Sequence, residues 1–183
     1  MIRNITKAII HLFDYCFNHV VLRVNRVVVG KNVVIHGRLY VHNLGHLAIG
    51  DDVVINSGER YNPVGGHTRC RLIVYTGGTL RIGNGVGISN STIVAKSLVE
   101  IGDGTLIGGS CNIWDTDFHS CDATIRGTAR DQGKTKPIHI GKSVFIGAHS
   151  ILLKGSEVGS RAIVGAGSIG SLRVGGDQVF IRR

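Results

Sequence analysis

Aliphatic residues recur every six positions through the second half of this chain. The leading residues of the successive steps are Ile82, Ile88, Val94, Ile101, Ile107, Ile113, Ile140, Ile146, Leu152, Val158 and Val164, and Gly170 ends the series. A period of six matches neither the 3.6-residue repeat of a helix nor the two-residue alternation of a strand. It fits a chain wound into a three-sided prism with six residues per side, in which leading residues stack from coil to coil. The pattern therefore predicts an all-β fold, a parallel β-helix.

Glycine follows many of the leading residues directly, and the chain holds 27 glycines but only 2 prolines. Glycine tolerates the backbone angles that tight, repeated corners require. A coil of three sides takes about 18 residues, which predicts about six coils. The 183 residues are expected to form one structural domain, with a helix over residues 1–26 and the β-helix over residues 27–183.

The period fails in two segments. Residues 56–79 lose the count and contain the turn-rich sequence Asn62-Pro63-Val64-Gly65-Gly66. Residues 119–137 are polar, basic and off the period. We expect both segments to form loops that leave the prism.

The first 26 residues are predicted to form an amphipathic helix, because apolar residues recur there at intervals of three or four. These residues are Ile2, Ile5, Ile9, Leu12, Phe13, Cys16, Phe17, Val20 and Val24. One interpretation is a cap that packs on the open end of the prism. Another is attachment to an anionic membrane, helped by Arg3, Lys7, Arg23 and Arg26. Both can hold together.

The formal net charge is +9, and the first fifty residues carry six Lys or Arg against one acid, Asp14. Such a chain favours phosphate-bearing partners. Nucleic acid is not expected, since no basic run is interleaved with aromatic residues. Four cysteines without a CxxC pair, and an N-terminus that lacks a signal-peptide pattern, indicate a cytoplasmic protein. If the helix binds lipid, the protein would lie at the inner face of the cytoplasmic membrane.

Residues 98–120 (LVEIGDGTLIGGSCNIWDTDFHS) and 136–169 (KPIHIGKSVFIGAHSILLKGSEVGSRAIVGAGSI) resemble the hexapeptide-repeat acyltransferases. Within that family they are similar to the maltose, galactoside and nodulation-type O-acetyltransferases and to the enzymes that acetylate capsule, exopolysaccharide or O-antigen sugars. The resemblance implies a left-handed prism and a homotrimer with active sites between neighbouring prisms. It also implies acetyl-coenzyme A as co-substrate and no metal.

The resemblance implies that His119 is the general base. A histidine with its ordinary pKa near 6.5 can take a proton from an acceptor hydroxyl and return it to the leaving thiolate. His139 and His149 are weaker candidates for this role. The backbone N–H of Ala148 would stabilise the oxyanion.

Three residues are candidates for contact with the acceptor sugar. Asn90 matches a substrate-binding asparagine of the family, although it could equally be a corner residue of the prism. Asp117 could orient the imidazole, bind the acceptor or be a solvated loop acid. Trp114 could stack on a sugar ring or serve in packing.

The coenzyme is expected along the last coils, where small side chains let the pantetheine arm approach the backbone. The predicted contacts are Phe145, Gly147, Ala148, Gly165, Ala166 and Ser171, with Lys154, Arg173 and more weakly Arg182 on the phosphates. Phe145 stands where relatives often have tryptophan. The C-terminal tail is shorter than the family's, which bears on the phosphate contacts.

The sequence thus predicts an acetyl-coenzyme A-dependent O-acetyltransferase of a sugar in surface polysaccharide synthesis. The acceptor would be a free sugar, a nucleotide sugar or a lipid-linked oligosaccharide. Three alternatives stay open: an N-acetyltransferase of an amino sugar, a zinc enzyme like the γ-class carbonic anhydrases, and a non-catalytic trimeric scaffold.

Overall fold

The computed structural model describes residues 2–181, with side chains from Ile9 onward. The chain winds through three parallel sheets, and each strand pairs with the strand three further along the sequence. Sheet A contains β1 (Val28–Val29), β4 (His46–Ile49), β7 (Thr79–Ile82), β10 (Leu98–Ile101), β13 (Ile138–Ile140), β16 (Glu157–Val158) and β19 (Arg173–Val174). Sheet B contains β2 (Val34–Gly37), β5 (Val54–Ser57), β8 (Gly87–Ser89), β11 (Leu106–Ile107), β14 (Phe145–Ile146), β17 (Ile163–Val164) and β20 (Val179–Phe180). Sheet C contains β3 (Tyr40–Asn43), β6 (Arg71–Val74), β9 (Thr92–Ala95), β12 (Asn112–Trp114), β15 (Ile151–Leu153) and β18 (Ile169–Gly170).

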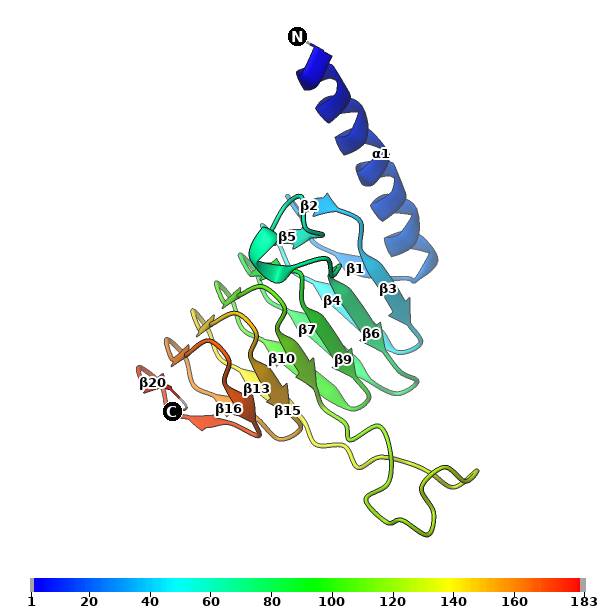
Figure 1. Cartoon of the computed structure of the whole chain (residues 1–183), viewed down its shortest axis with the longest axis vertical. Coiled ribbons are helices and arrows are strands. Elements are labelled where there is room, and N and C mark those ends of the chain that lie inside the picture. The colour runs from blue at the N-terminus through cyan, green and yellow to red at the C-terminus, as the bar shows by residue number, and fades with distance from the viewer. Residues whose placement is uncertain (1, 182–183) are drawn as a thin grey trace.

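These sheets are the sides of a left-handed, three-sided β-helix, so the predicted fold class is confirmed (Figure 1). Two sheets have seven strands and the third has six, slightly more coils than the sequence predicted. The aliphatic columns form the core. In sheet B, residues of successive coils stack in register and point inward, namely Ile55, Ile88, Ile107, Ile146 and Val164. Burying each such side chain contributes about 1.5–3 kcal/mol.

One predicted leading residue is wrong. In sheet C, Ile93 and not Val94 stands in register with Leu72 and Ile113, so Ile93 is the inward residue of this column. The corner between Ile88 and Ile93 is one residue shorter than in the following coil. Because two aliphatic residues are adjacent here, counting by six could not distinguish them.

The corner between sheets A and B repeats one backbone device in every coil. Each turn places one residue in the left-handed region of backbone space, which bends the chain sharply. These residues are Asn32, Asp52, Gly85, Gly104, Ser143, Arg161 and Asp177. Side chains also link neighbouring coils here. Asp51 N–H donates to Asn84 Oδ1 at 2.8 Å, and Asn84 N–H donates to Asp103 Oδ1 at 3.0 Å.

Helix α1 (Ile2–Val24) crosses the open end of the prism, and its N-terminal half extends past the first coil (Figure 1). It packs on β2 and β3. The side that touches the prism carries two buried polar residues, Asp14 and Asn18, beside the buried Leu22. The apolar side that the cap interpretation would bury faces outward, with Phe13 at 64% and Val20 at 59% exposure. The helix therefore covers the end of the prism, but through the face opposite to the one expected.

Two segments leave the prism, as predicted, but the first is shorter than residues 56–79, because β6 (Arg71–Val74) lies within that range as a strand of sheet C. The shorter one carries the 3-10 turn η1 (Pro63–Gly65) between sheets B and C. The longer one joins β12 to β13 and extends away from the body of the molecule (Figure 1). Within residues 2–181, no helix is long and apolar enough to cross a membrane.

Candidate active site

The long loop over residues 115–137 leaves and rejoins the prism at the corner between sheets C and A. Its first residue, Asp115, is fully buried, and its carboxylate accepts hydrogen bonds from the N–H groups of Lys96, Ser97 and Leu98 at 2.6–2.8 Å. A bridge between Thr116 and Thr135 closes the neck of the loop. The neck of the loop is therefore fixed to the coil above it.

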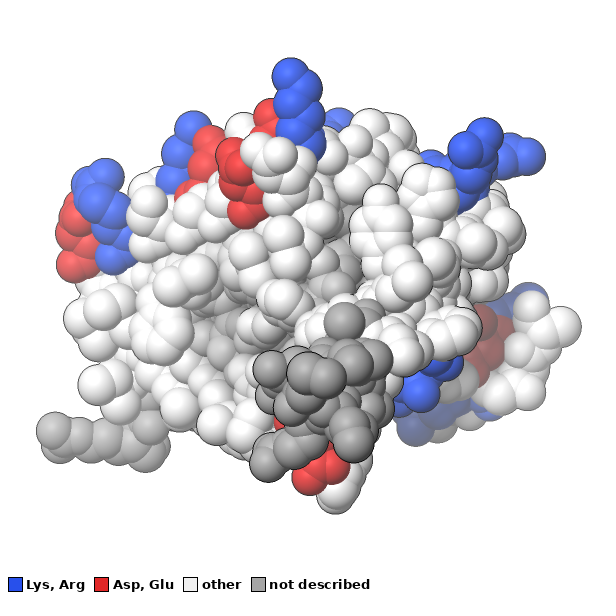
Figure 2. All heavy atoms as spheres, turned by 90° about the horizontal axis from the view of Figure 1, so that it is seen from above, with Lys and Arg blue, Asp and Glu red and all other residues white. Residues whose placement is uncertain are grey.

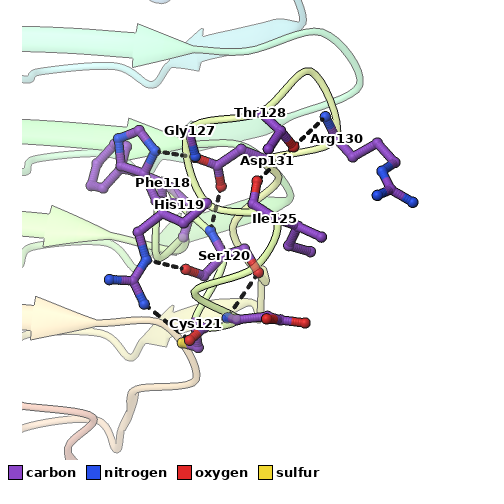
Figure 3. Close-up of polar contacts among 12 residues, drawn as sticks. Phe118, His119, Ser120, Cys121, Ile125, Gly127, Thr128, Arg130 and Asp131 are labelled. Atoms are coloured by element: carbon purple, nitrogen blue, oxygen red, sulfur yellow. Dashed lines mark hydrogen bonds and ion pairs between the residues drawn. The ribbon is translucent and has the colours of Figure 1, made fainter.

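His119 lies in this loop, and its ring is turned toward Asp131 (Figure 3). The distance from His119 Nδ1 to Asp131 Oδ2 is 2.8 Å. The His119 side chain is 71% exposed, whereas that of Asp131 is only 8% exposed. The ring is thus held on one side by a covered carboxylate and open to solvent on the other.

Asp131 organises the loop around His119. Its Oδ1 accepts from Ser120 N–H at 2.6 Å, and its Oδ2 accepts from Gly127 N–H at 2.7 Å. These two bonds, followed by the one from His119, lower the pKa of Asp131 to about 2. The carboxylate is therefore ionised at neutral pH and can only accept. Nδ1 of a neutral His119 then carries the proton, and Nε2 is left with a free lone pair.

Gly133 allows the returning chain to cross His119 closely. A Cβ at this position would lie 2.5 Å from Phe118 N and 2.9 Å from His119 N. Phe118 itself is in the left-handed region, with φ of 64°. Its ring meets that of Trp114 edge to face, with centroids 5.7 Å apart. The single tryptophan thus has a packing contact beside the candidate base.

Asp117 does not contact the His119 ring. Its Oδ1 forms an ion pair with Lys154 Nζ at 2.7 Å, and both side chains are about two-thirds or more covered. Lys154 lies one coil below, so the pair ties the loop to the next corner. The charge of Lys154, which the sequence assigned to coenzyme phosphate, has a partner within the chain. The roles predicted for both residues stay predictions.

Asn90 is only 2% exposed, and its side chain is occupied by the loop between β5 and β6. Gly58 N–H donates to Asn90 Oδ1 at 2.6 Å, and Asn90 Nδ2 donates to Asn62 O at 2.8 Å. With φ of 41°, Asn90 is also a left-handed corner residue. The structure thus gives it a structural role, which the sequence had left open beside acceptor binding.

The predicted coenzyme contacts fall at two corners of the prism. Gly147, Ala148, Gly165 and Ala166 lie at the corner between sheets B and C. A Cβ on Gly147 would collide with the backbone N of Ala166, so tight stacking of coils requires this glycine. Lys154 and Ser171 lie at the corner between sheets C and A, where Ser171 Oγ donates to Lys154 O at 2.8 Å. Arg173 is exposed on β19 of sheet A, and Arg182 lies outside the described residues.

One chain does not bring His119 and Phe145 together. Phe145 is 48% exposed on the outer surface of sheet B, beside a shallow hollow of about 360 Å³. The His119 loop leaves the prism at the corner between sheets C and A, which is opposite sheet B in a three-sided prism. The Ala148 backbone lies at a further corner. A site that uses all three residues therefore needs two copies of the chain.

No family model matches the chain. Over 153 residues it is 31% identical to the probable acetyltransferase Rv3034c of Mycobacterium tuberculosis. This match covers 82% of this chain and 45% of the relative. Over 88 residues it is 38% identical to the serine acetyltransferase of Buchnera aphidicola, covering 48% of this chain and 30% of the relative. The chain thus spans less than half the length of these curated relatives.

Among solved structures, the chain is similar to the hexapeptide-repeat-containing acetyltransferase VCA0836 of Vibrio cholerae in complex with acetyl-coenzyme A. The TM-score is 0.53 at 21% identity, over 82% of this chain and 63% of that chain. The chain has the hexapeptide-repeat β-helix fold. The resemblance predicted from residues 98–120 and 136–169 is therefore confirmed for the left-handed β-helix.

Two residues of this hexapeptide-repeat chain escaped the sequence prediction, Asp131 and Gly133. Both lie in the irregular loop, where no period places side chains. The available signal was that Asp131 is one of only two acids between Asp117 and Pro137. Among the described residues, no three His, Cys, Asp or Glu side chains are grouped so as to hold a metal ion. His119 and His139 pair instead with Asp131 and Glu100.

Proposed function

We propose that the protein transfers the acetyl group of acetyl-coenzyme A to a hydroxyl of a sugar, with His119 as general base. The observation that carries this proposal is the hydrogen bond from His119 Nδ1 to the ionised Asp131. It sets the tautomer in which Nε2 is the free base, and it leaves that nitrogen on the exposed side of the ring.

In the proposed reaction, His119 Nε2 takes the proton of the sugar hydroxyl as its oxygen attacks the thioester carbonyl. The resulting oxyanion accepts a hydrogen bond from the Ala148 N–H, which has no acceptor among the described residues. The carbon–sulfur bond then breaks, and the proton on His119 passes to the leaving thiolate. The products are the acetylated sugar and free coenzyme A, and His119 is returned to its neutral form.

We propose a homotrimer in which each site takes His119 from one chain and the groove beside Phe145 and Ala148 from the next. Sheet B supports this arrangement, because its outward column is apolar and unpaired in one chain. The exposed side chains of this column are Val34, Val54, Leu106, Phe145, Ile163 and Val179. An exposed apolar strip of this length is typical of a surface that meets another subunit.

The acceptor and the location are proposed from the sequence resemblance and the charge. A sugar of a surface polysaccharide, made in the cytoplasm at the inner face of the membrane, fits the exposed base and the basic N-terminal region. The same base and groove would serve an amino sugar. A screen of hydroxyl and amine acceptors with radiolabelled acetyl-coenzyme A separates O-acetylation from N-acetylation.

A mixed-trimer experiment tests the shared site. His119→Ala removes the base from one chain, and Ala166→Trp blocks the groove of another without burying the new side chain, because Ala166 is exposed. Each variant alone should be inactive. When the two are co-expressed with different tags, mixed trimers contain one site with an intact base and an intact groove. Random mixing then predicts recovery of roughly a quarter of the wild-type sites.

Failure to recover activity in purified mixed trimers would place base and groove in the same chain and overturn the shared site. The reverse control is a double variant that carries both changes, mixed with wild type. Mixed trimers with two wild-type chains retain one wild-type pair, so loss of all activity there would point to misfolding rather than to the site.

A further inference from the structure

We infer that the outward apolar face of α1 docks on an anionic lipid surface. This face, called the outer face below, consists of Ile9, Leu12, Phe13, Val20 and Val24, which are 49–74% exposed. At 100° per residue these positions share one side of the helix. An apolar strip so exposed on a helix of a folded chain indicates a binding surface.

Polar contacts between α1 and the first coil fix the direction in which the outer face points. Asp14 forms an ion pair with Arg38 at 2.8 Å. Asn18 donates to Gly37 O at 2.7 Å and accepts from Leu39 N–H at 3.0 Å, and both bonds are buried. Turning the helix to bury its apolar side would break all of these contacts. The helix is therefore held with its outer face away from the prism.

The charge around the outer face favours an anionic lipid surface as its partner. The only acid in the helix is Asp14, which lies on the side that packs on the first coil and is neutralised by Arg38. Arg23 is exposed next to Val24, and Arg26 is exposed just beyond the helix. The helix sequence also contains Arg3 and Lys7. A second copy of this helix would bring like charges together, whereas anionic headgroups would complement them.

The position of the helix suits a flat partner. Figure 1 shows α1 lying across the end of the coil stack rather than along it. Figure 2 views the molecule from above, and most of the Lys, Arg, Asp and Glu side chains that it draws in colour lie toward the edges of that view. If the proposed trimer axis is parallel to the coil stack, three outer faces point in one direction. Three weak lipid contacts would then act together.

Vesicle co-sedimentation of the full chain tests the inference. We expect the protein to sediment with vesicles of phosphatidylcholine and phosphatidylglycerol, and not with phosphatidylcholine alone. Phe13→Ser should weaken this binding, and the triple change Leu12→Ser, Phe13→Ser and Val20→Ser should lower it by roughly tenfold or more. Arg23→Glu should weaken binding to the anionic vesicles, and added salt should do the same.

The matched control is Val64→Ser, because Val64 is 65% exposed and Phe13 is 64% exposed. Val64 lies in η1 and not in the outer face of the helix, so its variant should bind vesicles as wild type does. Circular dichroism of each variant checks that helix content is unchanged.

Three outcomes would overturn the inference: wild type that ignores anionic vesicles, a triple variant that binds as well as wild type, or a triple variant whose only change is a smaller oligomer. The last result would assign the outer face to another copy of the chain. Vesicle binding needs neither acetyl-coenzyme A nor His119. A failure of the proposed acetyl transfer is therefore distinguishable from a failure of lipid docking.

Discussion

The ring of His119 is oriented by Asp131, twelve residues further along the same loop, through a bond of 2.8 Å from Nδ1 to Oδ2. Asp131 is in turn fixed by the N–H groups of Ser120 and Gly127. The loop therefore carries both the candidate base and the group that sets its tautomer. The regular coils hold this loop through its neck at Asp115 and through the ion pair of Asp117 with Lys154.

Asp131→Asn should lower kcat for acetyl transfer by roughly 100-fold while leaving the KM for acetyl-coenzyme A nearly unchanged. An asparagine can offer its NH2 group to the ring, which favours the tautomer with the proton on Nε2. Steady-state kinetics with a saturating sugar acceptor measure both constants. Asp122→Asn is the matched control, because Asp122 lies in the same loop and its carboxylate accepts only from Thr124. Equal losses in the two variants would contradict a specific role for Asp131.

Gly133→Ala should reduce activity by about tenfold, because its Cβ would collide with the backbone of Phe118 and His119 and displace the ring. The melting temperature should change little, since the loop lies outside the core. Gln132→Ala, at the exposed neighbouring position, should behave as wild type. Unchanged kinetics in the Gly133 variant would show that the loop can shift without moving the base.

Asp115→Ala should destabilise the fold by about 2–4 kcal/mol, since three backbone N–H groups at the corner between sheets C and A lose their acceptor. Thermal unfolding followed by circular dichroism would register this loss as a drop in Tm of roughly 5–15 °C. Asp115→Asn keeps one side-chain acceptor and should fall between the variant and wild type. A Tm equal to wild type for the alanine variant would contradict this role.

Native alkylation should label two of the four cysteines. Burial raises the pKa of Cys70 to about 12 and also raises that of Cys111, and both thiols are fully covered. The thiolates of Cys70 and Cys111 are therefore scarce at pH 8. Cys16 and Cys121, in contrast, are exposed to the reagent. Mass spectrometry after brief iodoacetamide treatment should find Cys16 and Cys121 modified. Rapid labelling of Cys70 in the folded protein would mean that the core opens far more often than this packing allows.

The regular coils were predictable from the sequence because each side of the prism requires one inward aliphatic residue. Ile107, Ile113 and Ile146 show this directly, since each occupies its counted position in the core. The count failed at Val94, because the corner before it is one residue shorter and the adjacent Ile93 takes the inward position. Periodicity thus identifies sheets well and corners of unusual length poorly.

The contacts within the loop and the packing face of the helix could be found only in the structure. No repeat relates Asp131 to His119, and Asp117 is nearer in sequence but pairs with Lys154. In α1 the apolar spacing was visible, yet the face that packs is the one that carries Asp14 and Asn18. Those polar side chains find backbone and Arg38 partners on the first coil, which a hydrophobic pattern does not reveal.

The most direct test of the central claim is the rate of transfer from radiolabelled acetyl-coenzyme A to a sugar acceptor by wild type and by His119→Ala, with coenzyme binding measured in parallel by calorimetry. The account predicts that wild type binds the coenzyme and acetylates the sugar. It predicts that His119→Ala binds the coenzyme equally but transfers acetyl at least roughly 100-fold more slowly. Transfer by His119→Ala at close to the wild-type rate, or wild type that binds no acetyl-coenzyme A, would contradict it.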